Sequence, residues 1–520
     1  MTELRRASVD SSLRSEFRLA AWAIAAAVIL AINLGSYPLL DADEGRNAEV
    51  GREMAATNDY VMPRLDGMPY LDKPIVYFAA EAAVMEVTGP TEFAARFPAW
   101  LFTIATGALL AWFAMRIGVD PAATAIMFLS MPLTIAFART VIFDSALSFF
   151  INAALIAFYL ERPTLAWAAM AFGVITKGPV AIALPLLVAI PYAIWHKRAR
   201  TLISIGGVIL FVVIITPWVW AVSLVVPDFL KYVLVTETAQ RLTTPALKRT
   251  GAIWYFVPYV LGGALPWVFS VGTAFSRSRP AEAGPHTWRE RFLWLWLIVP
   301  FVFFSLSQSK RPQYVLPLMA PIALLAASRL RTRAAGIAVA IFGALILAAI
   351  PFAKIPFGKE TAIILGAAAL ICGLIGIFTK PSIAVITISI PALLIPIITT
   401  DAMRSVAAMR SEKAFVANLH PKADIVGIRS FTGSMMFYLQ RPIIVVSPTG
   451  EELTSNYIIR HYSDFSARVK PPQWLDTAFS RPDTLFIVRK NDAANRALVE
   501  SHGGRALSED SHYVAYTIAR

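Results

Sequence analysis

The sequence has little charge and almost no cysteine. Asp, Glu, Lys and Arg account for 16% of its 520 residues and hydrophobic residues for 57%, whereas an average soluble domain is about 25% charged. The single cysteine, Cys372, cannot form a disulfide bond within the chain. The first apolar run, residues 17–40, is too long for a signal peptide and lacks a small-residue cleavage site after it. We therefore expect this run to be retained as a helix.

Long apolar runs dominate the chain up to residue 400. Many of them have the length of about 17–25 residues that crosses a bilayer. We predict a polytopic α-helical membrane protein with about 13 transmembrane helices, give or take one or two because the fourth to sixth runs are short or contain proline. The predicted spans are residues 17–40, 93–115, 121–138, 145–160, 164–176, 179–195, 201–226, 253–275, 291–307, 313–329, 335–353, 361–378 and 381–399.

Basic residues set the predicted orientation, because Lys and Arg accumulate in cytoplasmic loops. The amino terminus and three later clusters are the most basic parts, and all of them fall on one side when the spans alternate. The clusters are residues 196–200, 277–291 and 329–333. An odd number of spans then places the segment after residue 400 outside. The same rule explains the net charge of +13, so we predict no nucleic-acid partner.

From residue 401 the chain changes character. Short runs rich in Ile, Val and Phe alternate with polar, helix-permissive stretches, which is typical of a small α/β domain. The β-type runs are residues 425–428, 443–446 and 485–488. We predict a transmembrane domain at residues 1–400 with a catalytic loop at 41–92, and a periplasmic α/β domain at residues 401–520.

The first outer loop carries a dense group of acids and bases. Asp43, Glu44 and Arg46 lie within one helical turn, and polar residues near the membrane are functional candidates because burying them is costly. Partial desolvation would raise the pKa of Asp43, or of Asp144 in the second outer loop, and make the carboxylate a proton acceptor. Either acid could instead cap a helix. For Asp144 the cap and the catalytic role both stay open, whereas the charged neighbours of Asp43 favour an active site there.

Basic residues recur in five outer turns, against the tendency of Lys and Arg to lie inside. One such residue is explained by snorkelling to the headgroups. Five turns together favour an anionic ligand at this face, such as a lipid phosphate or pyrophosphate. The turns contribute Lys73, Arg139, Lys177, a group at 231–249, and Lys310 with Arg311.

These residues form an ordered set of short motifs. Along the chain they are D-E-x-R-x-A-E at 43–49, Lys73-Pro74, Arg139 with Asp144, T-K-G-P at 176–179 and K-R-P-Q-Y at 310–314. In their order along the chain and in the side of the membrane predicted for them, these motifs resemble those of the GT-C lipid-linked-sugar glycosyltransferases. Within these, the chain is most similar to the aminoarabinose transferases that modify lipid A, close to the protein O-mannosyltransferases. The resemblance covers nearly the whole chain and implies a GT-C-like fold.

The resemblance also implies residue roles. Asp43 would be the catalytic carboxylate and Asp144 the second acid of the same cavity, with Glu44 beside them. The residues implied in binding the donor phosphate are Arg46, Lys73, Arg139, Arg241, Lys310, Arg311 and Tyr314. The aminoarabinose enzymes have a Glu before Lys-Pro, and outer histidines, that can hold zinc. Here Asp72 takes that place and residues 227–250 contain no histidine, so we predict no metal ligand there and no firm cofactor, although a divalent metal stays open.

The implied function is transfer of a sugar, aminoarabinose or another pentose or hexose, from polyprenyl phosphate to lipid A or lipopolysaccharide. It would take place at the periplasmic face of a bacterial inner membrane. An acceptor hydroxyl needs a base such as Asp43, whereas an acceptor phosphate needs only positioning. Two alternatives stay open: protein O-glycosylation from the same donor, and a lipid or solute transporter. The transporter is disfavoured because we find no charged residue in mid-span and no inverted repeat.

Overall fold

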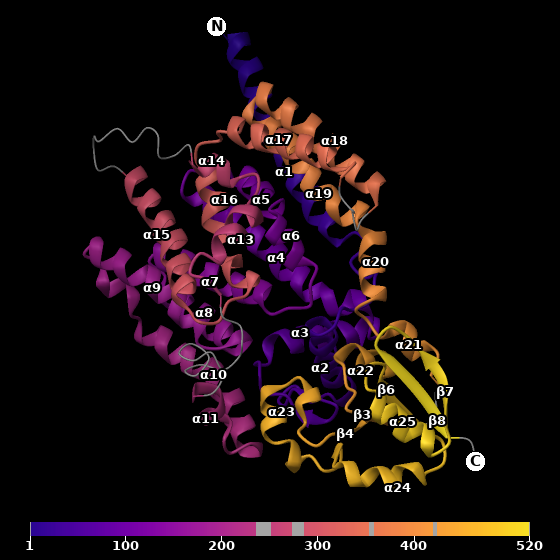
Figure 1. Ribbon diagram of the computed structural model, residues 1–520. Coiled ribbons are helices and arrows are strands. Elements are labelled where there is room, and N and C mark those ends of the chain that lie inside the picture. The colour runs from indigo at the N-terminus through magenta and orange to yellow at the C-terminus, as the bar shows by residue number, and fades with distance from the viewer. Residues whose placement is uncertain (1, 236–250, 273–284, 353–357, 420–423, 519–520) are drawn as a thin grey trace. The chain divides into compact units, whose positions relative to one another are not determined.

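The computed structural model describes residues 2–235, 251–272, 285–352, 358–419 and 424–518. The chain divides into two compact units (Figure 1). The first unit contains residues 1–34, 99–219 and 234–402, and the second contains residues 35–98, 220–233 and 403–520. The second unit thus joins the loop after the first apolar run to the carboxyl-terminal segment. The boundary predicted at residue 400 separates a transmembrane part from a periplasmic part, and it stays a prediction.

The first unit is helical. Its helices are α1 (Thr2–Ala31), α4 (Glu92–Arg116, which begins in the second unit), α5 (Pro121–Leu129), α6 (Pro132–Ala138), α7 (Asp144–Tyr159), α8 (Pro163–Lys177), α9 (Val180–Trp195), η1 (Ala199–Leu202), α10 (Ile205–Val225, which ends in the second unit), α13 (Phe256–Gly263), α14 (Val268–Gly272), α15 (Pro285–Leu306), η4 (Pro312–Leu318), α16 (Met319–Ala327), α17 (Arg333–Ala349), α18 (Lys359–Phe378), α19 (Pro381–Ile398) and α20 (Thr400–Ala408, which ends in the second unit). Helices α17 and α18 lie side by side as an antiparallel pair (Figure 1).

Several of these helices can cross a membrane. Among the residues that the structure describes, α4, α10, α18 and α19 are long and apolar enough, and α5 with α6 would make a fifth span if the bent pair is counted as one. Shorter apolar helices accompany them, including α7, α9 and α17. A polytopic helical fold is what the apolar runs predicted, whereas the count of about 13 spans stays a prediction.

Proline explains why some predicted spans are broken. The run at 121–138 contains two helices that meet at 70°, because Pro132 has no backbone N–H to continue α5 and instead begins α6. The run at 313–329 likewise starts as the 3₁₀ segment η4, which contains Pro317, before α16. A hydropathy pattern reports length and polarity but not such a break.

Large aromatic side chains fill the core of the first unit. Phe113, Trp267, Phe292 and Trp296 are at most 1% exposed and belong to one apolar cluster. The indole N–H of Trp267 donates to Ser130 Oγ at 2.9 Å, which satisfies this buried donor.

The second unit combines helices with a sheet. Its helices are α2 (Asp43–Thr57), α3 (Val76–Thr88), α11 (Phe229–Lys231), α21 (Lys413–Ala417), α22 (Gly433–Leu439), η5 (Glu451–Leu453), α23 (Asn456–Arg460), η6 (Tyr462–Asp464), η7 (Pro472–Trp474), α24 (Leu475–Phe479) and α25 (Ala493–Ser501). Its strands are β1 (Arg64–Leu65), β2 (Met68–Pro69), β3 (Asp424–Ile428), β4 (Ile444–Val446), β5 (Val469–Lys470), β6 (Thr484–Arg489), β7 (Gly504–Glu509) and β8 (Tyr513–Ile518). β1 and β2 form a small hairpin.

The six later strands form one mixed sheet in the order β5-β4-β3-β6-β8-β7. β3, β4, β5 and β6 are parallel, and β8 joins β6 antiparallel and carries the β7–β8 hairpin at the edge. Residues from α24 and α25, including Leu475 and Val499, pack with Phe486 and Val514 of the sheet. The predicted β-type runs are confirmed as strands: 425–428 and 485–488 fall within β3 and β6, and 443–446 matches β4 except for Ile443, which precedes the strand.

Two glycines let α22 pack directly on the start of α2. A Cβ atom on Gly433 would lie 2.1 Å from the backbone N of Arg46, and one on Gly45 would lie 2.3 Å from the backbone N of Ser434. Backbone cannot move aside as a side chain can, so any larger residue would separate the helices.

Gly433→Ala should therefore destabilise the second unit by about 1–3 kcal/mol, the usual cost of overpacking a core. The thermal unfolding midpoint of the purified protein in detergent would fall. Gly262→Ala is the matched control, because a Cβ atom there meets nothing within 4 Å. That control should leave the midpoint unchanged or slightly higher, and an equal loss in both variants would contradict the steric explanation.

Candidate functional site

The predicted site residues fall in both units. Asp43, Glu44, Arg46 and Lys73 belong to the second unit, and Arg139, Asp144, Lys310, Arg311 and Tyr314 to the first. Arg241 lies outside the described residues.

Asp43 begins helix α2, whose amino-terminal partial charge favours an acid there. Its carboxylate accepts a hydrogen bond from Arg46 Nη2 at 2.6 Å, and its side chain is 37% exposed. Asp43 is therefore accessible to a ligand and oriented by a neighbouring cation.

Arg46 is held on several sides. Its Nη1 donates to the carbonyl of Thr454 at 3.1 Å, while Nη2 donates to Asp43. Burial opposes its charge, but Tyr70, Asp43 and Asp72 outweigh that effect and raise the pKa of the guanidinium above its usual value. Arg46 therefore stays charged and fixes the rotamer of Asp43.

Glu44 lies in a buried ion pair. Its carboxylate accepts from Arg96 Nε at 3.1 Å and from Arg96 Nη2 at 2.8 Å, and both side chains are at most 5% exposed. Arg96 also donates to the carbonyls of Tyr37 and Pro38 and stacks over the Tyr37 ring. The predicted catalytic role of Glu44 does not fit this environment. We interpret the residue as structural, because a carboxylate bound on both oxygens inside the protein cannot reach a substrate.

Asp72 ties the first loop to α23. Its carboxylate accepts from Tyr232 Oη at 2.7 Å, from the backbone N–H of Asn456 at 2.8 Å and of Tyr457 at 3.1 Å, and from Ser455 Oγ at 3.2 Å. Four donors occupy its oxygens, so this carboxylate serves as an anchor. Lys73 donates to the carbonyl of Asp72 and remains half-buried.

Asp144 forms an ion pair in the first unit. Helix α7 begins at Asp144 itself, and the N-cap position is occupied by Phe143. The carboxylate, 4% exposed, accepts from the ammonium group of Lys177 at the end of α8. The Lys177 Nζ atom also lies 5.0 Å from the centre of the Tyr314 ring. Three motifs far apart in sequence thus meet here, and Lys177 is the residue that joins them.

Arg139 and Lys310 cap helices. Arg139 donates to the carbonyls of Leu30 and Ile32, both at 2.7 Å, where α1 ends. Lys310 donates to the carbonyls of Ser305 at 2.7 Å and Ser307 at 3.0 Å, where α15 ends. Because the last carbonyls of a helix lack partners within the helix, cations there are stabilising. The N–H groups of Arg139 and Lys310 that make these contacts are the ones predicted to bind the donor phosphate. Arg311 is half-buried beside η4.

Sequence reasoning missed Arg96. A lone arginine in the apolar run 93–115 was a usable signal, because a charge in such a run needs a buried partner. The pattern could not identify Glu44, 52 positions earlier, as that partner.

Comparisons with known proteins address the family. Residues 21–233 match the family model for dolichyl-phosphate-mannose-protein mannosyltransferases. Two relatives are named undecaprenyl phosphate-alpha-4-amino-4-deoxy-L-arabinose arabinosyl transferases. The relative from Aeromonas hydrophila is 30% identical over 312 residues, which cover 57% of this chain and 56% of the relative. The one from Pseudomonas fluorescens, enzyme 1 of that name, is 32% identical over 332 residues, which cover 60% and 59%. The chain therefore matches less than two thirds of the length of these relatives.

Solved structures extend the likeness to the whole fold. The crystal structure of ArnT from Cupriavidus metallidurans bound to undecaprenyl phosphate superposes with a TM-score of 0.82 and 24% identity, over 95% of this chain and 97% of that one. The apo structure of that protein gives a TM-score of 0.79 at the same identity and coverage. The resemblance that the motifs indicated is confirmed: this chain is related to the GT-C lipid-linked-sugar glycosyltransferases, with the aminoarabinose transferases among its relatives, and it has their polytopic membrane fold.

Proposed function

We propose that the chain is an integral-membrane glycosyltransferase. It transfers a sugar, aminoarabinose or another pentose or hexose, from a polyprenyl-phosphate donor to lipid A or another part of lipopolysaccharide. The observation that carries the proposal is the similarity of 30–32% to relatives named for this transfer, in a chain that presents Asp43 half-exposed beside Arg46. The protein lies in a bacterial inner membrane, with the amino terminus cytoplasmic, and the loop at 41–92 and residues 401–520 periplasmic.

In this proposal Asp43 acts as the base. The acceptor hydroxyl gives its proton to the Asp43 carboxylate, its oxygen bonds to the anomeric carbon, and the bond from that carbon to the polyprenyl phosphate breaks. Cations stabilise the phosphate that leaves as an anion. We assign this role to Lys73, Arg241 and Arg311. Asp144 remains a second acid, with Lys177 and Tyr314 beside it.

The roles of Arg139, Lys310 and Arg46 change in the light of their contacts. The donors of Arg139 and Lys310 are used by helix ends, so we propose that these two residues shape the fold around the donor site. Arg46, which pairs with Asp43, orients the base.

Lipid A from cells that lack the protein tests the proposal. Mass spectrometry of wild-type and deletion cells should show a species in the wild type that is heavier by one sugar, absent from deletion cells and restored by the intact gene. Identical lipid A in both strains would refute the acceptor that we propose.

A second candidate, protein O-glycosylation, is favoured by the match of residues 21–233 to the protein mannosyltransferase model. Mass spectrometry of exported proteins from the same two strains separates the candidates. A sugar that is lost from Ser or Thr in deletion cells, with lipid A unchanged, would favour protein O-glycosylation. Substrate uptake by proteoliposomes without any sugar transfer would indicate a transporter instead.

A further inference from the structure

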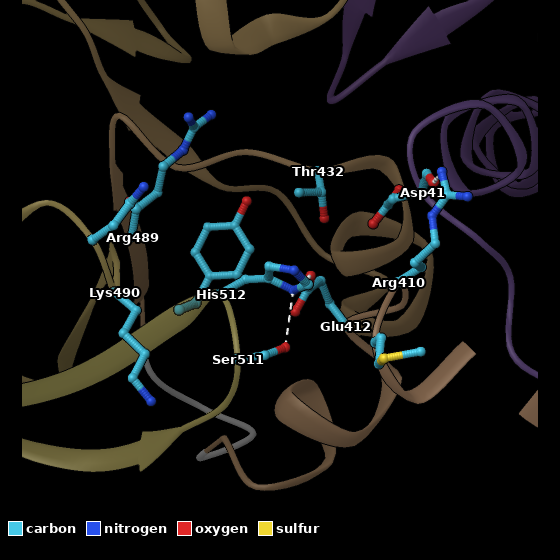
Figure 2. Close-up of a pocket in the computed structure, with 11 residues that line it drawn as sticks. Asp41, Arg410, Glu412, Thr432, Arg489, Lys490, Ser511 and His512 are labelled. Atoms are coloured by element: carbon cyan, nitrogen blue, oxygen red, sulfur yellow. Dashed lines mark hydrogen bonds and ion pairs between the residues drawn. The ribbon is translucent and has the colours of Figure 1, made fainter. Parts of the chain in front are cut away.

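The second unit contains a cavity of about 500 Å³ beside the sheet (Figure 2). Its lining comes from the start of the first loop, at Asp41, from the segment before α21 and from the β7–β8 turn. Asp43 is not among the residues that line it.

Three side chains of types that ligate metals lie close together here, and two of them, Glu412 and His512, line the cavity. They are Glu412, at the N-cap position of α21, and Asp510 and His512 in the turn between β7 and β8. One ligand atom of each lies within 4.8 Å of the other two, and His512 Nδ1 lies 3.5 Å from Glu412 Oε1. Two ligands of a tetrahedral zinc ion, each about 2.1 Å from the metal, lie about 3.4 Å apart. The spacing suits one ion.

The β7–β8 turn is rigidly held. Asp510 Oδ1 accepts from the backbone N–H of His512 and of Tyr513, both at 2.7 Å. The Asp510 N–H in turn donates to the carbonyl of Tyr513 at 3.0 Å. These contacts orient the Asp510 carboxylate, and second contacts of this kind fix the orientation of metal ligands.

Glu412 supplies an independent indication of a ligand. The residue is 3% exposed, and within the described part of the chain its Oε2 atom has no hydrogen-bond donor. A buried carboxylate oxygen without a partner is costly. A cation among Glu412, Asp510 and His512 would remove that cost.

The cations around the cavity are directed elsewhere. Lys490 pairs with Glu509 at 2.5 Å, and Arg410 Nη2 donates to the carbonyl of Asp41 at 3.1 Å. Arg489 lies on the exposed rim. Their contacts leave the centre of the cluster with two acids and an imidazole.

We propose that Glu412, Asp510 and His512 bind a divalent transition-metal ion, Zn²⁺ or Mn²⁺. The imidazole nitrogen favours these ions over Mg²⁺ and Ca²⁺, which select oxygen ligands. Water from the cavity completes the coordination. The ion links the start of α21 to the edge hairpin of the sheet, and this site is independent of the proposed transferase activity.

A shared proton is the rival explanation for the short distances. Burial and the neighbouring Asp510 raise the pKa of Glu412 to about 9, so the two carboxyl groups can hold one proton between them. The two explanations differ in the role of His512. A metal ion needs the imidazole as a ligand, whereas a proton shared by the two carboxyl groups does not.

The test uses the full-length protein in detergent, stripped with a chelator and dialysed against ZnCl₂, MnCl₂ or MgCl₂. Elemental analysis should find about one equivalent of zinc or manganese per chain and none of magnesium above background, and Zn²⁺ should raise the thermal unfolding midpoint. His512→Ala should weaken binding at least 10-fold, as Glu412→Gln should.

Control variants decide the outcome. His502→Ala removes another exposed histidine, at the end of α25, and should bind metal as the wild type does. His512 is 49% exposed, so its replacement leaves folding intact even if Glu412→Gln does not. The proposal fails if the wild type binds no stoichiometric metal, or if His512→Ala binds as tightly as His502→Ala.

Discussion

Asp43→Asn should lower the rate of sugar transfer by about 100- to 10,000-fold, the usual contribution of a general base. The asparagine can still accept the hydrogen bond from Arg46, 2.6 Å from Asp43 in the native protein, so the start of α2 should keep its structure. Transfer would be measured with purified full-length protein, a polyprenyl-phosphate sugar and lipid A.

The control for Asp43→Asn is Asp476→Asn, the same change at an exposed position of α24 in the same unit. It should leave the rate unchanged. Both variants should elute as the wild type does on size exclusion. Wild-type turnover by Asp43→Asn would remove the catalytic role of this carboxylate, whereas loss in both variants would point to general damage.

Arg96→Leu should cost about 3–5 kcal/mol of stability, because it leaves a buried carboxylate uncompensated. The lost guanidinium binds both oxygens of Glu44 and the carbonyls of Tyr37 and Pro38. We expect a large fall in the unfolding midpoint, measured by tryptophan fluorescence in detergent. Arg116→Leu, at the exposed end of the same helix α4, should have little effect.

A double-mutant cycle isolates the ion pair. Glu44→Leu combined with Arg96→Leu should be more stable than Arg96→Leu alone, because no charge is left buried without a partner. Strictly additive losses would mean that the two side chains do not stabilise each other.

Local features of this fold could be predicted from the sequence. Residues 425–428 of β3 and 485–488 of β6 are rich in Ile, Val, Leu and Phe, and both strands lie at the centre of the sheet with these residues buried, so composition alone identified them. The polar edge strand β7, Gly504–Glu509, is mostly exposed and carries no such signal. Its pairing with β8 depends on the turn at Asp510, which a composition pattern does not report.

The site could be predicted only in part, because the partners of charged residues come from distant segments. The position of Asp43 at the start of α2 follows from an acid after an apolar run. Arg139 looks like a loop cation in the sequence, and only the fold shows that it caps α1. Glu412 and His512 are 100 positions apart in number and lie in no motif, so neither could be singled out before the sheet was known.

The contact between Asp41 and α22 has a consequence for biosynthesis. The Asp41 carboxylate accepts from the backbone N–H and the hydroxyl of Ser434, 393 positions later. A ribosome that adds about 5–20 residues per second needs about 20–80 s to cover that distance. For that time α2 is present in the nascent chain without the helix that covers it, and a chaperone that recognises α2 would have its longest opportunity before translation reaches α22.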